Sequence, residues 1–266
     1  MQINIGQIIK ERNPLLFKLL PNRLLKWLKN LLREKEINEV IADSEGVEDV
    51  AFANLVLEKI GVNINTEGLE HIPKSGPCII AANHPLGGVD GMALLREVAS
   101  IRPDVRFVVN DILLKIPNFK TVFVGVNKHG SSPREQLLKI EEIYKSDMCI
   151  LVFPAGYCSR KIDGVVKDAD WNPSFAKKAK KYNIPVVPAS IKAVNTKRFY
   201  AINIWRRRFG IKANLELMTL PDEMFKQKGK TIDFILHPAI SKSELTKIGK
   251  AKDWSNKVRE IVYSAI

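Results

Sequence analysis

The chain has 266 residues, 45% of them hydrophobic, and 42 Lys and Arg against 29 Asp and Glu give a formal net charge of +13. A chain of this size can bury a sizeable core, and one large domain is favoured over two. The excess of positive charge favours an anionic partner, either nucleic acid or a membrane surface. No apolar run approaches the roughly 18 to 20 residues that span a bilayer, and charges interrupt the apolar N-terminus, which excludes a signal-peptide pattern. We therefore expect a cytoplasmic protein that is peripheral on the inner face of the cell membrane.

The first distinctive segment covers residues 13–33, which are rich in leucine and cations. Asn22 follows Pro21 and is suited to cap a helix. In that helix the leucines share one face, flanked by Trp27, and the cations share the other: Leu24, Leu25, Leu28, Leu31 and Leu32 against Arg23, Lys26, Lys29 and Arg33. Such a helix suits an anionic bilayer interface, and it equally suits packing of the leucines on the parent domain. We assign residues 1–64 to an N-terminal helical, membrane-associating segment and residues 65–266 to the main domain.

The rest of the chain alternates between apolar runs and helical patterns. Residues 34–65 are helical in pattern, and Gly61 is placed to end a helix. The predicted strands cover residues 77–82, 105–109, 122–126, 148–153, 185–191, 213–220 and 231–236. The predicted helices cover residues 91–100, 133–145, 173–182 and 241–265. This alternation predicts an α/β fold with a mostly parallel mixed sheet flanked by helices and preceded by the amphipathic N-terminal segment.

The most informative motif lies between the strand at 77–82 and the helix at 91–100. It reads Asn83-His84-Pro-Leu-Gly87-Gly88-Val-Asp90, which places an imidazole and a carboxylate on one strand-to-helix turn. A carboxylate on one ring nitrogen sets the tautomer and leaves the other nitrogen free to take a proton from a hydroxyl. The glycines allow a tight turn and a close approach of substrate. A catalytic role for His84 and Asp90 is favoured over a structural one, whereas His71 and His237 fit structural or solvated roles.

Three further segments end predicted strands on the same edge of a parallel sheet. One carries Gly125 with the cations Lys128 and Arg134, and the next reads Phe153-Pro154-Ala-Gly156-Tyr-Cys-Ser159-Arg160. The last is the Val-Pro188 strand. We expect Arg160 to be an exposed cation that can fork to a carboxylate or phosphate.

The order of these four motifs resembles the glycerolipid and lysophospholipid acyltransferase family over roughly residues 65–240. His84 and Asp90 resemble the catalytic pair of its first motif, the segment from Gly125 to Arg134 its acceptor-binding motif, and the runs ending at Arg160 and Pro188 its third and fourth motifs. There are departures from the family pattern. One extra residue separates His84 from Asp90, Ala155 replaces a glutamate, and the acceptor-binding arginine is missing from its usual place. In these features the chain is similar to a bacterial, hemolysin-like branch that includes O-acyltransferases of ornithine and glycine lipids.

The resemblance implies acyl transfer from a thioester, acyl carrier protein or acyl-coenzyme A, to a lipid hydroxyl on the 3-hydroxyacyl chain of an N-acyl amino-acid lipid. His84 would act as the base and Asp90 would orient it, without a metal or cofactor. Backbone amides near Gly87–Gly88 or Gly156 would hold the oxyanion. The substrate-binding set implied by the motifs is Asn83, Gly87, Gly88, Gly125, Lys128, Arg134, Phe153, Pro154, Gly156, Ser159, Arg160 and Pro188.

Two alternatives stay open. A lysophosphatidic acid acyltransferase would use the same chemistry on another acceptor. A basic binding protein for membrane or nucleic acid would have no catalysis, although the sequence lacks a nucleic-acid motif and interleaves few aromatic residues with its cations.

Overall fold

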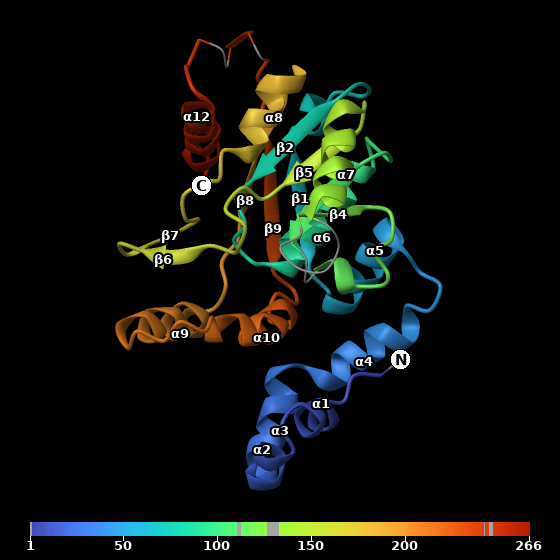
Figure 1. Cartoon of the computed structure of the whole chain (residues 1–266), viewed down its shortest axis with the longest axis vertical. Coiled ribbons are helices and arrows are strands. Elements are labelled where there is room, and N and C mark those ends of the chain that lie inside the picture. Colours follow the sequence, from blue (N-terminus) through green and yellow to red (C-terminus); the bar gives the residue numbers. More distant parts are fainter. Residues whose placement is uncertain (1, 111–112, 127–132, 242, 245–246) are drawn as a thin grey trace.

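A seven-stranded sheet covered by helices on both faces forms the body of the chain, and a helical arm extends from one end of it (Figure 1). This arrangement is seen in a computed structural model, which describes residues 2–110, 113–126, 133–241, 243–244 and 247–266. The predicted fold class, a mostly parallel mixed sheet flanked by helices, is confirmed. Among the described residues, no helix is long and apolar enough to cross a membrane.

The strands of the sheet are arranged in the order β1-β9-β8-β2-β5-β3-β4. All neighbours are parallel except β8 and β9, so β1 and β9 run opposite to the other five strands. The carboxyl ends of β2, β5 and β8 therefore meet at one edge. The bounds are β1 (Asn63–Glu67), β2 (Cys78–Ala82), β3 (Arg106–Asn110), β4 (Phe123–Val126), β5 (Cys149–Val152), β8 (Val186–Lys192) and β9 (Thr231–Leu236), with a separate hairpin of β6 (Arg160–Ile162) and β7 (Val165–Lys167).

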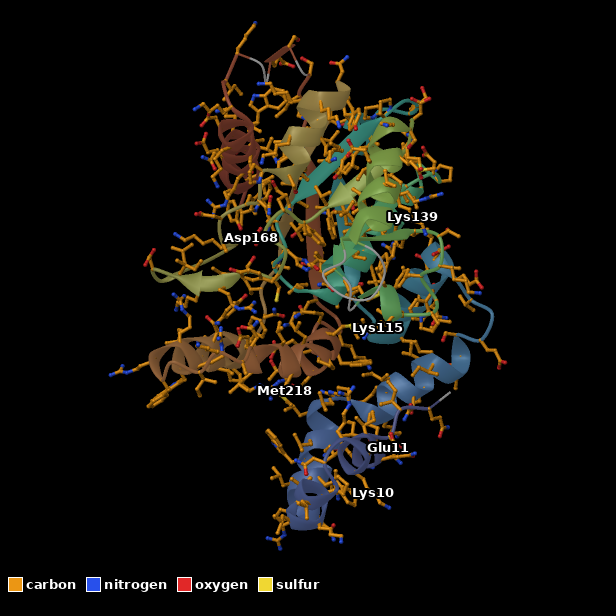
Figure 2. All side chains as sticks on the ribbon, in the orientation of Figure 1. Lys10, Glu11, Lys115, Lys139, Asp168 and Met218 are labelled. Carbon is orange, nitrogen blue, oxygen red and sulfur yellow. The ribbon has the colours of Figure 1, made fainter. Side chains whose placement is uncertain are left out.

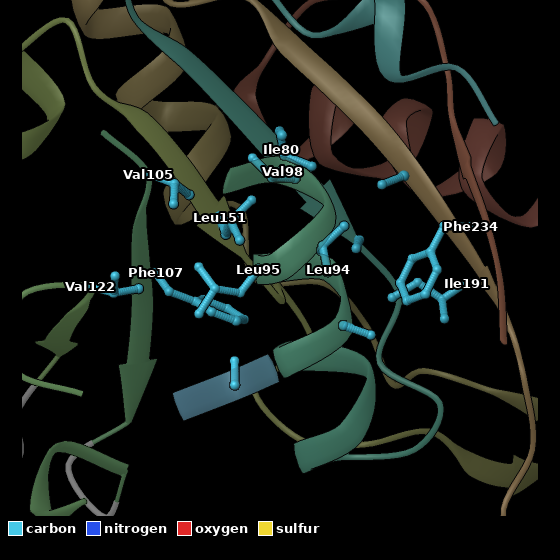
Figure 3. Close-up of a cluster of buried hydrophobic side chains, with 14 of the residues drawn as sticks. Ile80, Leu94, Leu95, Val98, Val105, Phe107, Val122, Leu151, Ile191 and Phe234 are labelled. Carbon is cyan, nitrogen blue, oxygen red and sulfur yellow. The ribbon is translucent and has the colours of Figure 1, made fainter. Parts of the chain in front are cut away.

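Alternate side chains of the central strands enter two hydrophobic layers. On one face, Ile80 of β2 and Leu151 of β5 pack with Leu94 and Leu95 of α6 (Gly88–Ala99), as seen in Figure 3, and α5 (Asp49–Ile60) adds Leu57 to that layer. The opposite face is covered by α7 (Pro133–Lys145), α8 (Ser174–Tyr182) and α12 (Ala251–Ser264). Strands buried on both faces require apolar residues at nearly every position, which explains the continuous apolar runs of the sequence.

The N-terminal arm consists of α1 (Ile5–Arg12), α2 (Pro14–Leu19), α3 (Asn22–Leu31) and α4 (Glu34–Asp43). No residue of α3 is fully buried, and Trp27 is 55% exposed. Asn22 does not cap α3 as predicted, because Pro21 takes the N-cap position and makes no side-chain bond there. The boundary we predicted after residue 64 falls inside β1. The end of the N-terminal segment is part of the body, because α5 packs on α6 and β1 pairs with β9.

Several predicted elements are wrong. Residues 63–65 are strand rather than helix, because alternate residues of β1 are half-buried at the sheet edge. Residues 213–220 are not a strand: η3 (Leu215–Thr219) is a 3₁₀ turn that leads into α10 (Leu220–Phe225). The C-terminal helix begins at Ala251 instead of Ser241, where the Asp253 carboxylate accepts from the Lys250 amide at 2.8 Å. We also missed α9 (Lys197–Arg208), a helix with little periodicity in its apolar residues.

Candidate active site

The turn between β2 and α6 places His84 and Asp90 at the carboxyl edge of the sheet. Gly87 has φ +97° and ψ −119°, a backbone conformation that residues with a Cβ rarely adopt. Its position next to Leu220 is also tight, since a Cβ there would lie 3.3 Å from Leu220 Cδ2. Gly87 therefore lets the chain turn from β2 into α6 within a few residues.

Asp90 is fully buried in the first turn of α6 and is held by the turn itself. Its Oδ2 accepts a hydrogen bond from the Leu86 amide at 2.8 Å, and its Oδ1 accepts one from the Gly91 amide at 2.8 Å. Hydrogen bonds to a carboxylate are stronger than those between neutral groups. Both carboxylate oxygens of Asp90 are thus held in place by backbone amides of the turn.

The His84 ring lies against this carboxylate, with its Nδ1 3.1 Å from Asp90 Oδ1. Among the described residues Nδ1 has no aligned hydrogen-bond acceptor, so the contact is an ion-pair distance rather than a complete hydrogen bond. Nδ1 itself is buried, so the 17% exposure of the His84 side chain comes from its other atoms. Phe153 stacks on the ring with centroids 3.9 Å apart and fixes its plane.

Neighbouring strand ends clamp the backbone of the turn. The buried Asn83 side chain donates to the Ile191 carbonyl at 2.9 Å and accepts from the Ile191 amide at 2.8 Å. The Asn195 side chain donates to the Pro85 carbonyl at 3.1 Å. The Ser159 amide donates to the His84 carbonyl at 2.7 Å. The motifs after β2, β5 and β8 are therefore joined by hydrogen bonds at one edge of the sheet.

Asp168 is a second buried carboxylate at this edge, and the sequence analysis missed it. It accepts hydrogen bonds from the Ser159 hydroxyl at 2.6 Å, the Trp171 indole at 2.9 Å and the His84 amide at 3.3 Å. Burial raises the pKa of Asp168, although the bonds from Ser159 and Trp171 act in the opposite direction. An isolated Asp in a predicted connection gives no signal of such a role, because the partners come from separate segments. Figure 2 places Asp168 beside the β6–β7 hairpin, and its bond from the His84 amide joins that side of the body to the His84 turn.

Arg160 does not have the exposure we predicted, since only 7% of its side chain is accessible. Its Nε donates to Glu216 Oε1 at 3.1 Å, and its guanidinium lies 4.9 Å from the centroid of the Phe199 ring. Burial alone would raise the pKa of Glu216, but hydrogen bonds from its own amide, Asn203 and Arg206, with the charge of Arg160, lower it. Arg160 thus joins the loop after β5 to η3.

The other predicted substrate-binding residues differ in their accessibility to solvent. Gly88 is exposed at the start of α6, and Gly156 is exposed with φ +74°. Pro154 is buried, and its carbonyl accepts from the Asn172 amide at 2.9 Å. Pro188 lies inside the sheet, opposite Ala81.

The predicted acceptor-binding segment after β4 is only partly described. A Cβ on Gly125 would lie 2.0 Å from Leu114 Cδ1, so that glycine admits the Leu114 side chain. Lys128 and the side chain of Arg134 lie outside the described residues.

Comparison with known proteins agrees with this architecture. A family model described as Acyltransferase matches residues 7–265, and the chain belongs to that acyltransferase family, whose members transfer acyl groups. Its similarity to proteins named lyso-glycine lipid O-acyltransferase places it among the acyltransferases of lipid biosynthesis. The resemblance predicted from the motifs is therefore confirmed.

Two such relatives align over nearly the whole chain. One is from Phocaeicola vulgatus, is 31% identical, and the alignment covers 98% of this chain and 94% of the relative. The other is from Bacteroides thetaiotaomicron, is also 31% identical, and the alignment covers 98% of this chain and 96% of the relative. Among solved structures, the 1-acyl-sn-glycerophosphate acyltransferase PlsC from Thermotoga maritima matches with a TM-score of 0.50 and 19% identity, over 90% of this chain and 93% of that one. This last likeness shows the shared fold alone.

Asp168→Asn should lower kcat of acyl transfer about tenfold or more, because one amide oxygen replaces two carboxylate oxygens and leaves a buried donor of Ser159 or Trp171 unpaired. KM should change little, since Asp168 acts through the His84 turn. Asp163→Asn is the matched control, an exposed aspartate in the β6–β7 hairpin. Equal kcat values for the two variants would contradict a positioning role for Asp168.

Proposed function

We propose that the chain transfers a fatty acyl group from a thioester to the hydroxyl of an N-(3-hydroxyacyl) amino-acid lipid, with His84 as the general base. The observation that carries this proposal is the 3.1 Å contact between His84 Nδ1 and the buried Asp90. Because Nδ1 is buried there, the exposed part of the ring belongs to its other atoms. His84 Nε2 takes the hydroxyl proton as the acceptor oxygen attacks the thioester carbonyl, and returns it to the departing thiolate. Asp90 orients the ring and stabilises the imidazolium.

The start of α6 supplies the complementary electrostatics. The first amides of a helix have no partner within the helix, and they carry its partial positive charge. Those of α6 begin at Gly88, in the same turn as His84. Gly91 already donates its amide to Asp90, so in our proposal the amides near Gly87–Gly88 hold the oxyanion that forms on the thioester carbonyl.

The acceptor assignment is supported by the relatives, both named lyso-glycine lipid O-acyltransferase. A glycine lipid offers a chain hydroxyl and a free carboxylate. Since Arg160 is buried against Glu216, we assign the carboxylate to Lys128 or Arg134. The donor is acyl carrier protein or acyl-coenzyme A, both of which are anionic and suit a net charge of +13.

The N-terminal arm is proposed to dock on an anionic membrane. Its helices expose apolar side chains, with Leu15 at 73% and Leu19 at 81% exposure. The arm is fixed to the body by Arg33, whose Nε donates to Asp222 of α10 at 2.9 Å. An arm docked on lipid would thus hold the body near the bilayer, peripheral to it.

His84→Ala should reduce kcat about a thousandfold or more, because it removes the base, and Asp90→Asn should reduce it about a hundredfold or more by misorienting the ring. Turnover is measured with N-(3-hydroxyacyl)glycine and an acyl thioester, and circular dichroism checks the fold. His71→Gln is the matched histidine control, since its ring contacts only the Leu236 carbonyl among the hydrogen bonds described, and it should keep wild-type turnover. Near wild-type turnover of His84→Ala would disprove the proposed base.

The wild-type protein should favour N-(3-hydroxyacyl)glycine over 1-acylglycerol 3-phosphate by about tenfold or more in kcat/KM, because a site built for one polar head leaves buried groups unpaired with the other. Product formation from each acceptor is followed by mass spectrometry at a fixed thioester concentration. The reverse preference would identify a lysophosphatidic acid acyltransferase instead.

Leu15→Ser with Leu19→Ser should weaken binding to anionic vesicles about tenfold or more, because two exposed leucines no longer enter the interface. Co-sedimentation measures the binding. Turnover of a short-chain, water-soluble acceptor should be unchanged, since α2 lies in the part of the arm that is remote from the body in Figure 1. Unaltered vesicle binding would remove the arm from the membrane contact.

A further inference from the structure

A second apolar surface lies on the body itself, across α9 and η3. We call it the α9–η3 surface. Its large apolar side chains are between 38% and 66% exposed: Ile204, Trp205, Phe209, Ile211, Leu215, Leu217 and Met218. Trp205 and Phe209 stack with ring centroids 5.6 Å apart, over a shallow apolar hollow of about 290 Å³. Met218 of η3 lies on the side of the α9–η3 surface that faces the N-terminal arm in Figure 2.

These apolar side chains are exposed although α9 itself is packed on the body. The opposite side of α9 is buried in the body through Phe199, Tyr200 and Asn203. A helix at the surface of a soluble domain places polar residues outward. Here the outward side instead combines aromatic and aliphatic residues over a contiguous area, which marks an interaction surface.

The charged residues around these apolar groups are of one sign where they are exposed. Lys197, Arg207, Arg208 and Lys212 are exposed. The acidic residue of the segment, Glu216, is fully buried and paired with Arg160 and Arg206. The α9–η3 surface therefore presents apolar rings surrounded by cations.

We propose that the α9–η3 surface is a second membrane-docking surface that seats on an anionic lipid bilayer, and this inference rests on the proposed function because it assumes a lipid substrate. Tryptophan with arginine is suited to the bilayer interface, where the ring enters the headgroup region and each cation meets anionic lipid. A membrane is favoured over an acidic carrier protein because a neighbouring element exposes apolar side chains beside cations as well. Leu24 and Trp27 are exposed on α3, which contacts α10, and Arg33 beside them pairs with Asp222.

The buried side of the same segment leads to the catalytic turn. The Tyr200 hydroxyl accepts from the Asn195 amide at 3.1 Å, and the Asn195 side chain donates to the Pro85 carbonyl at 3.1 Å. Leu220, which follows η3, packs against Gly87. Docking of the α9–η3 surface would thus bring the bilayer to the segment that contacts the His84 turn.

Tryptophan fluorescence tests the contact directly in full-length protein. Trp171 and Trp254 are buried, so Trp27→Phe leaves Trp205 as the exposed indole. With vesicles of phosphatidylcholine and phosphatidylglycerol, the emission of this variant should shift to shorter wavelength, and brominated lipid should quench it. Unchanged emission while the protein co-sediments with vesicles would overturn the proposal. A shift caused by acyl carrier protein but not by vesicles would assign the surface to that partner and also overturn it.

Paired variants give the second measurement. Arg207→Gln with Arg208→Gln should weaken binding to these vesicles about tenfold or more, and so should Trp205→Ser with Phe209→Ser. The controls are Lys177→Gln with Lys180→Gln on α8, at the opposite end of the body in Figure 1, and Leu138→Ser on α7, where the leucine is 56% exposed. Equal binding by the α9–η3 variants and the controls would contradict the proposal.

Turnover of a water-soluble acceptor distinguishes failure of the docking proposal from failure of the proposed function. It should be the same in wild-type protein and in all α9–η3 variants, because the changed side chains are exposed, whereas α9 is buried in the body through Phe199, Tyr200 and Asn203. Absence of turnover in every protein, with lipid quenching of Trp205 intact, would refute the proposed function and leave the docking surface standing.

Discussion

The structure of the candidate site depends on a carboxylate that is held by its own turn. Asp90 is fully buried, and the amides of Leu86 and Gly91 take up one oxygen each. A buried charge without such partners would cost several kcal/mol. The turn must therefore keep its shape to keep these two hydrogen bonds, and Gly87 makes that shape accessible. The extra residue between His84 and Asp90 is accommodated here, within the turn, without separating the imidazole from the carboxylate.

The neighbouring motifs act chiefly on the backbone of this turn. The side-chain amide of Asn83 donates to the Ile191 carbonyl and accepts from the Ile191 amide. The Ser159 amide donates to the His84 carbonyl, and the Ser159 hydroxyl donates to Asp168. Side chains that resemble a substrate-binding set thus also form the internal frame of the site. A frame of this kind limits how far the imidazole can move, and catalytic geometry tolerates little displacement.

Much of this arrangement follows from the sequence, and the exceptions have a common cause. Runs such as 78–82 and 149–152 are apolar throughout because both faces of the sheet are covered, and their parallel direction brings the motifs to one edge. His84 and Asp90 could be paired because they are close in the chain. Asp168 and Glu216 could not be assigned, since Asp168 meets the His84 amide and Glu216 meets Arg160 across 84 and 56 residues of sequence. Arg160 was expected at the surface for the same reason: its buried partner lies in η3, a segment predicted to be a strand.

The stacking of Phe153 on His84 decides from which direction a molecule can reach the imidazole. With centroids 3.9 Å apart and planes inclined by 17°, the phenyl ring covers one side of the imidazole. The edge that carries Nδ1 is closed as well, because that atom is buried beside Asp90. An approaching molecule therefore meets only the opposite edge or the remaining side of the ring. One aromatic side chain thus makes access to the histidine one-sided.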